Sequence, residues 1–466
     1  MIELLKLCGF EDYDIESELP RVKKAFDRLG ITAEDIERGK QRLTEYFDME
    51  LKGVRKLWGM CVRQIVNLSL AREEGKKKLI YWGMSPGMEI IGSALATKSK
   101  EVYAADPERI FNVIFGILFG KLVPILEAAE GKWLKGGTAA HCAGVKTRLG
   151  LFALSLIPKP DLLVTSGFLC DTSPKTNDLL HELYDIPTYY LETCDDREFG
   201  KDSDTERVVK FAAKGMRKLC KRVQEVVGFE ITDDMLWEVL RARSSFTRVA
   251  GKLSDLHQSS DPFPISATHV VLWRAFGTEP LSIDHLQGPI DAIKTLYEEV
   301  QEKVDKGLGV VKKGAPRILA INPPAGSDPR LEHLMNQVGI ALVAAETGLF
   351  PPDGRSSLDV GELKDPYEQM SLYLRGSHVT NLGERISIII GACKRLKVDG
   401  VLARFHVGCR SNAGDAIMIK NAVTKELGIP VLLLEWEAFD PRVYNHEQYK
   451  RRFELFETMM RTHRQN

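Results

Sequence analysis

The sequence lacks an excess of charge of either sign, because 64 Lys and Arg residues stand against 65 Asp and Glu residues in a chain of 466. This balance provides no basic surface field to attract nucleic acid, so we expect no nucleic-acid partner. Long hydrophobic runs are also missing. The most apolar stretch, IFNVIFGILFG from Ile110, is followed by Lys121 and is too short to cross a bilayer, so we expect no membrane partner.

Signals for export and for nucleotide binding are absent as well. The N-terminal MIELLKLCGFEDYD carries acidic residues and lacks the charged-then-apolar layout of a secretion signal, so we expect a soluble cytoplasmic protein. The stretch GMEIIGS from Gly87 has Ser93 where a P-loop has Lys, and no GxGxxG follows a strand. We therefore expect that this chain does not itself hydrolyse ATP.

Cysteine is sparse and unpaired in its spacing. The eight cysteines are too few for a disulfide scaffold, and no two of them form a CxxC pair, which excludes zinc ribbons, thioredoxin-like redox pairs and ferredoxin-type runs. Any metal or cluster must therefore be assembled from distant parts of the chain. The cysteines are Cys8, Cys61, Cys142, Cys170, Cys194, Cys220, Cys393 and Cys409.

What the chain does contain is a regular alternation of apolar strands and helical segments. Short continuous apolar runs such as DLLVTSG, PRILAINPP and IPVLLLEW predict parallel strands that are covered on both faces. The pattern predicts an α/β fold: two similar parallel-sheet (Rossmann-like) domains with an N-terminal helical region and a helical insertion. We place the N-terminal helices at 1–77, the first α/β domain at 78–200, a helical bridging region at 201–312 and the second α/β domain at 313–466.

The two α/β regions look like copies of one plan. Asp161 opens DLLVTSGFLCD and Asp399 opens DGVLARFHVGC; in each copy a strand follows, then Gly and Cys. A helix and an Ile-Pro that starts the next strand come later in both copies. Ligands of parallel α/β sheets bind at the carboxyl ends of the strands, so Cys170 and Cys409 occupy equivalent positions, and facing crevices would bring both thiols into one cleft.

A third cysteine shares this environment. Cys142 follows a Gly-Gly turn and opens an apolar helix in KGGTAAHCAGVKTRLG. A helix N-terminus presents free N–H groups that lower the pKa of a thiol, so we expect thiolate character at Cys142, Cys170 and Cys409. The alternative for each is a small buried hydrophobe.

The remaining cysteines carry weaker signals. Packing is the better explanation for Cys8, Cys61, Cys220 and Cys393, which lie within helical segments. Cys194 closes the strand in YYLETCDD, where it is either a fourth ligand or a solvated neighbour of two aspartates.

Several segments resemble the family of 2-hydroxyacyl-CoA dehydratases and class I (ATP-dependent) benzoyl-CoA reductases: HCAGVKTRLG, DLLVTSGFLCDTSPKT, ELYDIPTYYLETC and HVGCRSNAGDAIMIKNAVTKELGIPVLLLEWEAFDPRVYNHEQYKRRFE. The resemblance runs from about residue 75 to the end. It implies one [4Fe–4S] cluster held by Cys142, Cys170 and Cys409. It also implies a homologous second α/β subunit and a separate ATP-hydrolysing iron–sulfur activator. The length and the N-terminal helices are most similar to the longer benzoyl-CoA reductase subunit.

By this resemblance the substrate is an acyl-CoA thioester that receives low-potential electrons. Three thiolates for four irons leave one iron without a protein ligand. His141 and His406 are candidate proton donors, with a structural hydrogen-bonding role as the alternative for both. Cations for the pyrophosphate of CoA could come from four positions near the ligand cysteines, although surface solvation explains each equally well. They are Lys146, Arg148, Lys175 and Arg410.

Other functions remain open at this point. The first is an (R)-2-hydroxyacyl-CoA dehydratase subunit, which eliminates water by way of a ketyl radical. The second is a double-cubane cluster reductase, which would recruit more cysteines, such as Cys194 and Cys393. A zinc site of three cysteines and His141 is the third, and a non-catalytic two-domain ligand-binding protein is the fourth.

Overall fold

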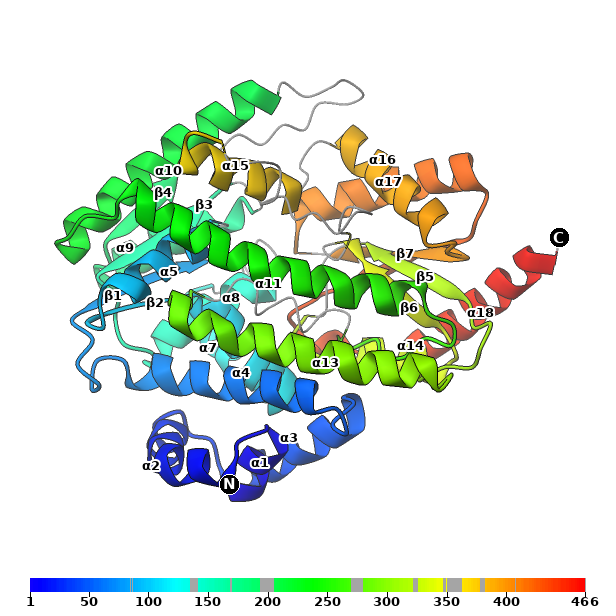
Figure 1. The fold of residues 1–466 in the computed structure, drawn as a ribbon, viewed down its shortest axis with the longest axis horizontal. Coiled ribbons are helices and arrows are strands. Elements are labelled where there is room, and N and C mark those ends of the chain that lie inside the picture. The colour runs from blue at the N-terminus through cyan, green and yellow to red at the C-terminus, as the bar shows by residue number, and fades with distance from the viewer. Residues whose placement is uncertain are drawn as a thin grey trace.

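The computed structural model describes residues 1–83, 85, 87–134, 141–167, 170–192, 205–269, 280–321, 326–346, 349, 363–377, 382–406 and 408–465. Figure 1 shows two sheet-and-helix halves side by side, with long helices lying across both of them. The N-terminal helices form a separate layer at one edge of the molecule.

The N-terminal layer consists of α1 (Ile2–Leu7), α2 (Asp12–Arg28), α3 (Ala33–Tyr46) and the longer α4 (Lys52–Leu70). Helix α3 begins at a capping box formed by Thr32 and Asp35. The Thr32 side chain accepts the Asp35 N–H, and the Asp35 carboxylate accepts the Thr32 N–H. This reciprocal capping satisfies two backbone donors that the first helical turn leaves without a partner.

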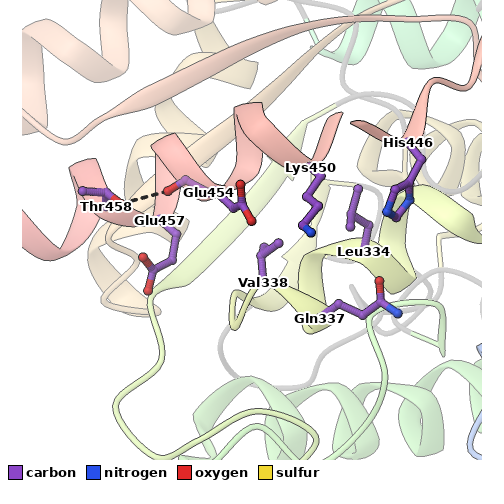
Figure 2. A pocket seen from close by; sticks show the side chains of 8 residues that line it. All are labelled: Leu334, Gln337, Val338, His446, Lys450, Glu454, Glu457 and Thr458. Atoms are coloured by element: carbon purple, nitrogen blue, oxygen red, sulfur yellow. Dashed lines mark hydrogen bonds between the residues drawn. The ribbon is translucent and has the colours of Figure 1, made fainter. Parts of the chain in front are cut away.

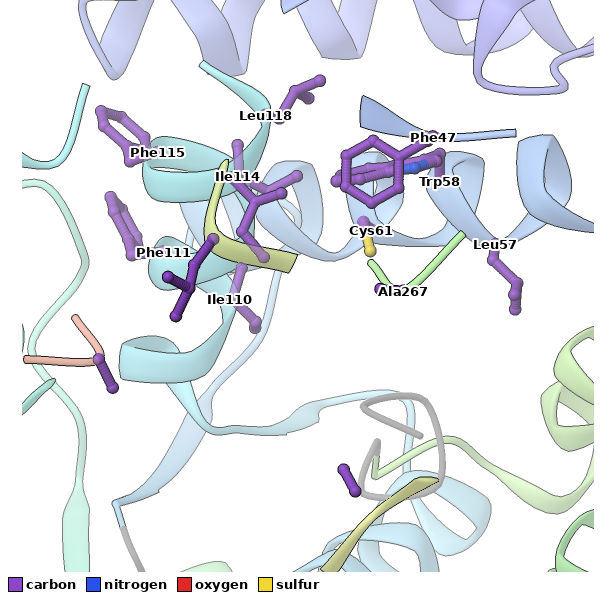
Figure 3. Close-up of a cluster of buried hydrophobic side chains, with 14 of the residues drawn as sticks. Phe47, Leu57, Trp58, Cys61, Ile110, Phe111, Ile114, Phe115, Leu118 and Ala267 are labelled. Atoms are coloured by element: carbon purple, nitrogen blue, oxygen red, sulfur yellow. The ribbon is translucent and has the colours of Figure 1, made fainter. Parts of the chain in front are cut away.

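An apolar cluster fastens this layer to the rest of the protein (Figure 3). Phe47 and Trp58 meet edge to face with ring centroids 5.0 Å apart, and Cys61 lies in the same cluster at 4% exposure. The opposite side of the cluster comes from α6 (Pro107–Phe111) and from η1 (Asn112–Leu118), a π-helix that continues α6. The apolar stretch from Ile110 is therefore a buried helical segment, most of it π-helical.

The first sheet is parallel, with the strand order β2-β1-β3-β4. Its strands are β1 (Lys78–Gly83), β2 (Val102–Ala105), β3 (Leu162–Ser166) and β4 (Thr188–Leu191). The helices that connect or cover them are α5 (Met88–Lys98), α7 (Val123–Lys132), α8 (Ala143–Ala153) and α9 (Thr172–Tyr184).

The second sheet repeats this topology in the order β6-β5-β7-β8, also parallel. Its strands are β5 (Arg317–Ile321), β6 (Ala341–Ala345), β7 (Gly400–His406) and β8 (Val431–Trp436). The helical segments of this part are α14 (Arg330–Gln337), α15 (Pro366–Ser377), α16 (Leu382–Arg395), α17 (Arg410–Leu427), η6 (Pro441–Val443) and α18 (His446–Gln465).

Three long helices and one short helical turn of the described residues lie between the two halves in the sequence. They are α10 (Thr205–Val227), α11 (Asp233–Ser259), the short η4 (Ile283–Leu286) and α13 (Gln287–Asp305). Helix α11 contacts α5 beside the first sheet and β6 of the second, and it also packs on α13 (Figure 1). Helix α15 crosses back to pack on α10. The halves are thus held together by helices as well as by direct contacts.

These two four-stranded parallel sheets with their helices confirm the predicted α/β fold of two Rossmann-like domains. Of the eight strands that the described residues form, the sequence patterns identified seven and missed β2. With the sequence VYAA, β2 is only four residues long and lacks the long apolar run that marks the other strands. No helix in the described ranges is both long enough and apolar enough to cross a membrane.

The repeat extends to single hydrogen bonds at the amino ends of the strands. Asp161 donates its N–H to the Leu79 carbonyl and accepts the Leu79 N–H on its carboxylate at 2.8 Å. Asp399 makes the same two bonds with Arg317, where the N–H to carboxylate distance is 2.7 Å. Asp161 therefore fastens β3 to β1, and Asp399 fastens β7 to β5. A proposed ligand cysteine follows β3 and β7.

The Ile-Pro turns repeat in the same way. The Pro187 carbonyl accepts the Leu163 N–H at the start of β4, and the Pro430 carbonyl accepts the Val401 N–H at the start of β8. Proline has no N–H to donate, but its carbonyl can still enter the ladder at the first residue of an edge strand. The internal similarity seen in the sequence thus corresponds to equivalent contacts.

Replacing Asp161 by alanine should destabilise the first sheet by about 1–3 kcal/mol, because the Leu79 N–H and Arg72 lose their acceptor. Burial raises the pKa of Asp161, but the Leu79 N–H and Arg72 outweigh it and hold the pKa below its usual value. The stabilisation is therefore present above the unfolded pKa of about 3.9 and is lost as the pH falls through the lower folded pKa. Thermal melts of Asp161→Ala and wild type should converge in acid, whereas Asp178→Ala, at an exposed position, should match wild type throughout.

Candidate functional site

Two of the predicted ligand cysteines stand at helix N-termini, as expected. Cys142 is the N-cap of α8 and is 8% exposed. Cys409 is the N-cap of α17 and follows the carboxyl end of β7, with its N–H donated to the His406 carbonyl. Cys170 follows the carboxyl end of β3 and lies two residues before the start of α9.

The two halves meet at Cys142. A Cβ atom on Gly408 would lie 2.5 Å from the Cβ of Cys142 and 2.7 Å from its Cα, closer than real Cβ atoms approach. The same Cβ would lie 2.9 Å from a carboxylate oxygen of Glu437, which follows β8. The Glu437 carboxylate also accepts the N–H of Ala143, the first residue of α8. Glycine at 408 therefore lets the segment before Cys409 lie directly against Cys142.

Cys170 belongs to the same neighbourhood. Its sulfur accepts backbone N–H groups of Thr172 and Ser173 from the first turn of α9. The charge of Cys170 acts on the Cys142 thiol, and the charge of Cys409 acts on Cys170. Cys170 therefore lies within electrostatic reach of both Cys142 and Cys409, although the three come from positions far apart in the sequence.

The expected lowering of the thiol pKa values is wrong for two of these cysteines. Burial raises the pKa of Cys142 well above its usual value, and Cys170 and Glu437 raise it further, against the N–H of Val145. Burial also raises the pKa of Cys170, despite its N–H contacts with α9. The helix N-termini act in the expected direction, but desolvation and neighbouring negative charges outweigh them.

This environment fits a cationic metal core better than free thiolates. A thiol that coordinates a metal is deprotonated outright, so the raised pKa values of Cys142 and Cys170 do not prevent either from serving as a metal ligand. Within the described ranges, no three His, Cys, Asp or Glu side chains converge closely enough to hold one metal ion. The structure therefore gives no support to a zinc site with His141. A [4Fe–4S] cubane needs a wider arrangement, because each thiolate binds a different iron.

The two candidate histidines differ in their contacts. The Nδ1 atom of His406 lies 3.4 Å from both the Trp436 carbonyl and the Ala438 N–H, and its Nε2 lies 3.7 Å from Glu437. These contacts hold together the ends of β7 and β8. Both ring nitrogens of His141 are buried and have no hydrogen-bond partner among the described residues. Burial lowers the pKa of His141, and two nearby lysines lower it further.

Two carboxylates of the site were missed by the sequence analysis. Glu437 stands one residue past β8, and Glu108 follows β2 by three residues, so both lie beyond carboxyl ends of strands. Burial raises the pKa of Glu108 to about 7, with Arg148 acting against it. Glu108 escaped notice because β2 was not recognised, and Glu437 because only thiols and histidines were considered at strand ends.

The four candidate CoA cations do not form one group. Arg148 is 2% exposed and paired with Glu108 at 2.6 Å, so it is neither a phosphate ligand at the surface nor a solvated side chain. Lys146 pairs with Glu130 at 3.1 Å, and Lys175 is exposed. The side chain of Arg410 lies outside the described residues.

The other cysteines behave as expected where they are described. All four of the helical cysteines are at least 95% buried, and no disulfide involves them. Burial raises the pKa of Cys8 and of Cys393 to about 12, which marks both as inert thiols. Cys393 lies on the buried face of α16 and packs in the core, which does not favour its use in a second cubane. Cys194 lies outside the described residues.

An open groove of about 450 Å³ lies elsewhere, between α14 and α18 (Figure 2). It is lined by Lys450 and His446 together with Glu454 and Glu457. None of the three proposed ligand cysteines lines it. The mixed charges do not favour a phosphate-bearing ligand over any other.

Known proteins of one family are similar to this chain. The family model described as 2-hydroxyglutaryl-CoA dehydratase, D-component, matches residues 102–460. One of the benzoyl-CoA reductase subunits of Thauera aromatica is 23% identical over 347 residues, covering 68% of this chain and 76% of that protein. The alpha subunit of (R)-2-hydroxyglutaryl-CoA dehydratase from Acidaminococcus fermentans is 21% identical over 313 residues, covering 65% of this chain and 61% of that protein. The (R)-phenyllactyl-CoA dehydratase alpha subunit of Clostridium sporogenes is 19% identical over 309 residues, covering 65% and 72%.

Replacing Gly408 by alanine should separate the two halves at Cys142, because the added methyl group overlaps the Cys142 backbone. We expect a loss of about 1–3 kcal/mol in stability, as for other overpacked sites, and faster alkylation of Cys142 in the metal-free protein. Iodoacetamide labelling followed by peptide mass spectrometry measures this rate. Gly414→Ala in α17 is the matched control, since a Cβ there meets open space. Unchanged labelling of Cys142 in Gly408→Ala would show that the contact does not shield this thiol.

Proposed function

Because the chain belongs to the 2-hydroxyglutaryl-CoA dehydratase, D-component family, we propose that it is an iron–sulfur subunit of an enzyme acting on acyl-CoA thioesters. The proposed ligands of its [4Fe–4S] cluster are Cys142, Cys170 and Cys409. The contact between Gly408 and Cys142 carries this proposal, because it brings the N-caps of α8 and α17 together across the two halves.

The ligand set supports a cluster that is open at one corner. Three cysteines for four irons leave one iron without a protein ligand, and when bound such a cluster supplies single electrons at low potential. The chain's own residues contribute burial and orientation. Cys142 is nearly excluded from solvent, and the N–H groups of Thr172 and Ser173 orient the Cys170 sulfur.

Of the two proton-donor candidates, His141 is better suited. It precedes Cys142 directly, and its buried ring nitrogens have no partner within the described part of the chain. Its lowered pKa keeps the ring neutral near pH 7, so one ring nitrogen carries an N–H that can donate a hydrogen bond to a substrate oxygen. The Nδ1 atom of His406 contacts backbone groups at the end of β8, which supports a structural role.

For the reaction we propose ATP-dependent reduction of an aromatic acyl-CoA, of the benzoyl-CoA reductase kind. The relative from Thauera aromatica, which is named as a part of benzoyl-CoA reductase, supports this. The family resemblance implies that a separate ATP-hydrolysing activator would deliver the electrons. A homologous second subunit would complete the enzyme, in keeping with relatives that are named as subunits.

Dehydration of an (R)-2-hydroxyacyl-CoA is the second candidate. Two relatives are dehydratase subunits, and the family model carries a dehydratase description. A turnover assay with the partner subunit and activator separates the two candidates when benzoyl-CoA is compared with a 2-hydroxyacyl-CoA. ATP consumed with every product molecule indicates reduction, whereas a catalytic trace of electrons indicates dehydration.

The anaerobically purified chain should be brown and contain iron and sulfide near four each, the content of one cubane. Alanine in place of Cys142, Cys170 or Cys409 should each lower the iron content strongly, because each removes a ligand. The control is Cys220→Ala, which removes a buried thiol that packs in the core. A wild-type chain without iron, or three alanine variants that all keep a full complement, would refute the proposal.

A further inference from the structure

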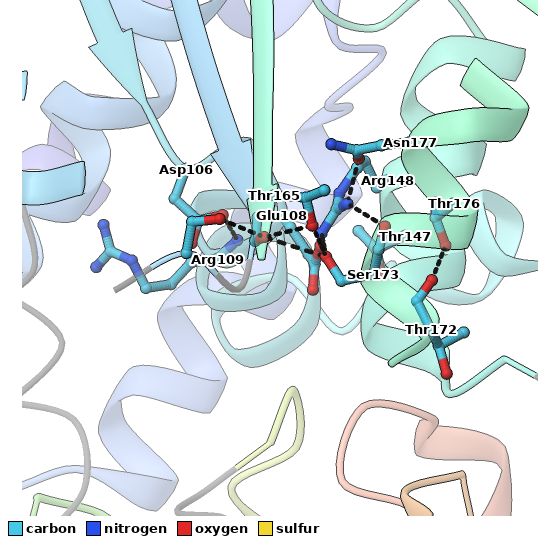
Figure 4. Close-up of polar contacts among 12 residues, drawn as sticks. Asp106, Glu108, Arg109, Thr147, Arg148, Thr165, Thr172, Ser173, Thr176 and Asn177 are labelled. Atoms are coloured by element: carbon cyan, nitrogen blue, oxygen red, sulfur yellow. Dashed lines mark hydrogen bonds and ion pairs between the residues drawn. The ribbon is translucent and has the colours of Figure 1, made fainter. Parts of the chain in front are cut away.

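Arg148 is buried in the first half of the molecule with every donor occupied (Figure 4). Its Nε and Nη2 atoms bond the same oxygen of Glu108, at 3.0 and 2.6 Å. Nη1 bonds the side-chain oxygen of Asn177 at 2.6 Å and the Ser173 carbonyl at 3.3 Å. Nη2 also bonds the Ser173 hydroxyl at 3.0 Å. These five bonds match the five N–H donors of a guanidinium group.

The backbone around Arg148 is shaped to receive it. A Cβ atom on Gly83, the last residue of β1, would lie 1.8 Å from Nη2, so only glycine permits this approach. The Ser173 hydroxyl donates to the Gly83 carbonyl at 3.1 Å and lies 2.8 Å from the Thr165 hydroxyl. Burying a charge is costly unless it is paired and hydrogen-bonded, and this site meets both conditions.

The network joins the helices that follow two of the proposed ligands. Arg148 lies on α8, which begins at Cys142. Ser173 and Asn177 lie in the first turns of α9, and the Ser173 N–H contacts the Cys170 sulfur. Glu108 comes from α6, and its second oxygen lies 3.4 Å from the position of a Cβ on Gly144, in the first turn of α8.

We propose that Arg148 is a positioning residue that sets the spacing between Cys142 and Cys170 by locking α8 against α9. This inference rests on the proposed function, because it treats these two cysteines as ligands of one cluster. A cluster with rigid iron–sulfur geometry binds well only if its thiolates are held at a fixed separation before it arrives. The guanidinium reaches α6, α8 and α9 at once, which fixes both helix starts.

Lysine cannot reproduce this arrangement. Its ammonium group is a single point with three donors, whereas the planar guanidinium bonds partners on two sides through five. Arg148→Lys should therefore retain the positive charge near Glu108 and loosen the bonds to α9. Ser173→Ala provides a milder variant, which removes one hydroxyl from the network and keeps the arginine.

The first readout needs no cluster. In the reduced, metal-free full-length chain, a short bifunctional thiol reagent should join Cys142 to Cys170, as measured by peptide mass spectrometry. Arg148→Lys should lower the cross-linked fraction about tenfold, the change in equilibrium expected from losing one charged hydrogen bond. Ser173→Ala should lower the cross-linked fraction by a smaller factor. This variant also tests the proposal if Arg148→Lys does not fold.

The matched control is Arg317→Lys. Arg317 bonds the carbonyls of Gln258, Ser260 and Leu396 at the amino end of β5, at the opposite edge from the ligand cysteines. Its loss should lower the melting temperature without changing the cross-link. In the iron-loaded chain, Arg148→Lys should in addition alter the EPR spectrum of the reduced cluster, which a purely structural role would leave unchanged.

The outcomes separate this inference from the proposed function. A wild-type chain that never holds iron refutes the proposed function, whatever the cross-links show. Iron in the wild type, together with an unchanged cross-link and EPR spectrum in folded Arg148→Lys and Ser173→Ala, refutes the positioning role alone. A reduced cross-link with an altered spectrum supports it.

Discussion

The close approach of Gly408 to Cys142 is the contact on which the site depends. The segment after β7 can lie against the start of α8 only because residue 408 has no side chain. Glu437 adds to this junction, since its carboxylate from the end of β8 accepts the N–H of Ala143. The N-termini of α8 and α17, which belong to different halves, thereby converge, and the N-cap of each helix is a cysteine.

The two edges of each sheet serve different purposes. At the amino edge, Asp161 and Asp399 bond the neighbouring strands in the same way, and the Ile-Pro carbonyls extend the ladders. The three proposed ligand cysteines, Glu108 and Glu437 lie at the carboxyl edge. The amino edge therefore fastens the strands to one another, whereas the carboxyl edge holds the residues of the proposed site. This division follows from strand direction, because all strands of a parallel sheet end at one edge.

Much of the fold could be predicted from the sequence, because burial leaves a direct mark on composition. Continuous apolar runs identified seven strands, and the repeated order of Asp, strand, Gly and Cys identified the duplicated topology. The short strand β2 left no such mark. Electrostatics was harder to foresee: the helix N-termini indicated lowered thiol pKa values, but the depth of burial and the nearness of Glu437 appear only in three dimensions. Arg148 looked like a surface cation for the same reason.

Diffraction from anaerobically grown crystals at the iron absorption edge tests the central claim most directly. We predict one compact group of iron atoms bonded to the sulfurs of Cys142, Cys170 and Cys409, between the carboxyl edges of the two sheets. Iron bound at other cysteines, or crystals of freshly purified protein with no iron signal at this junction, would contradict it.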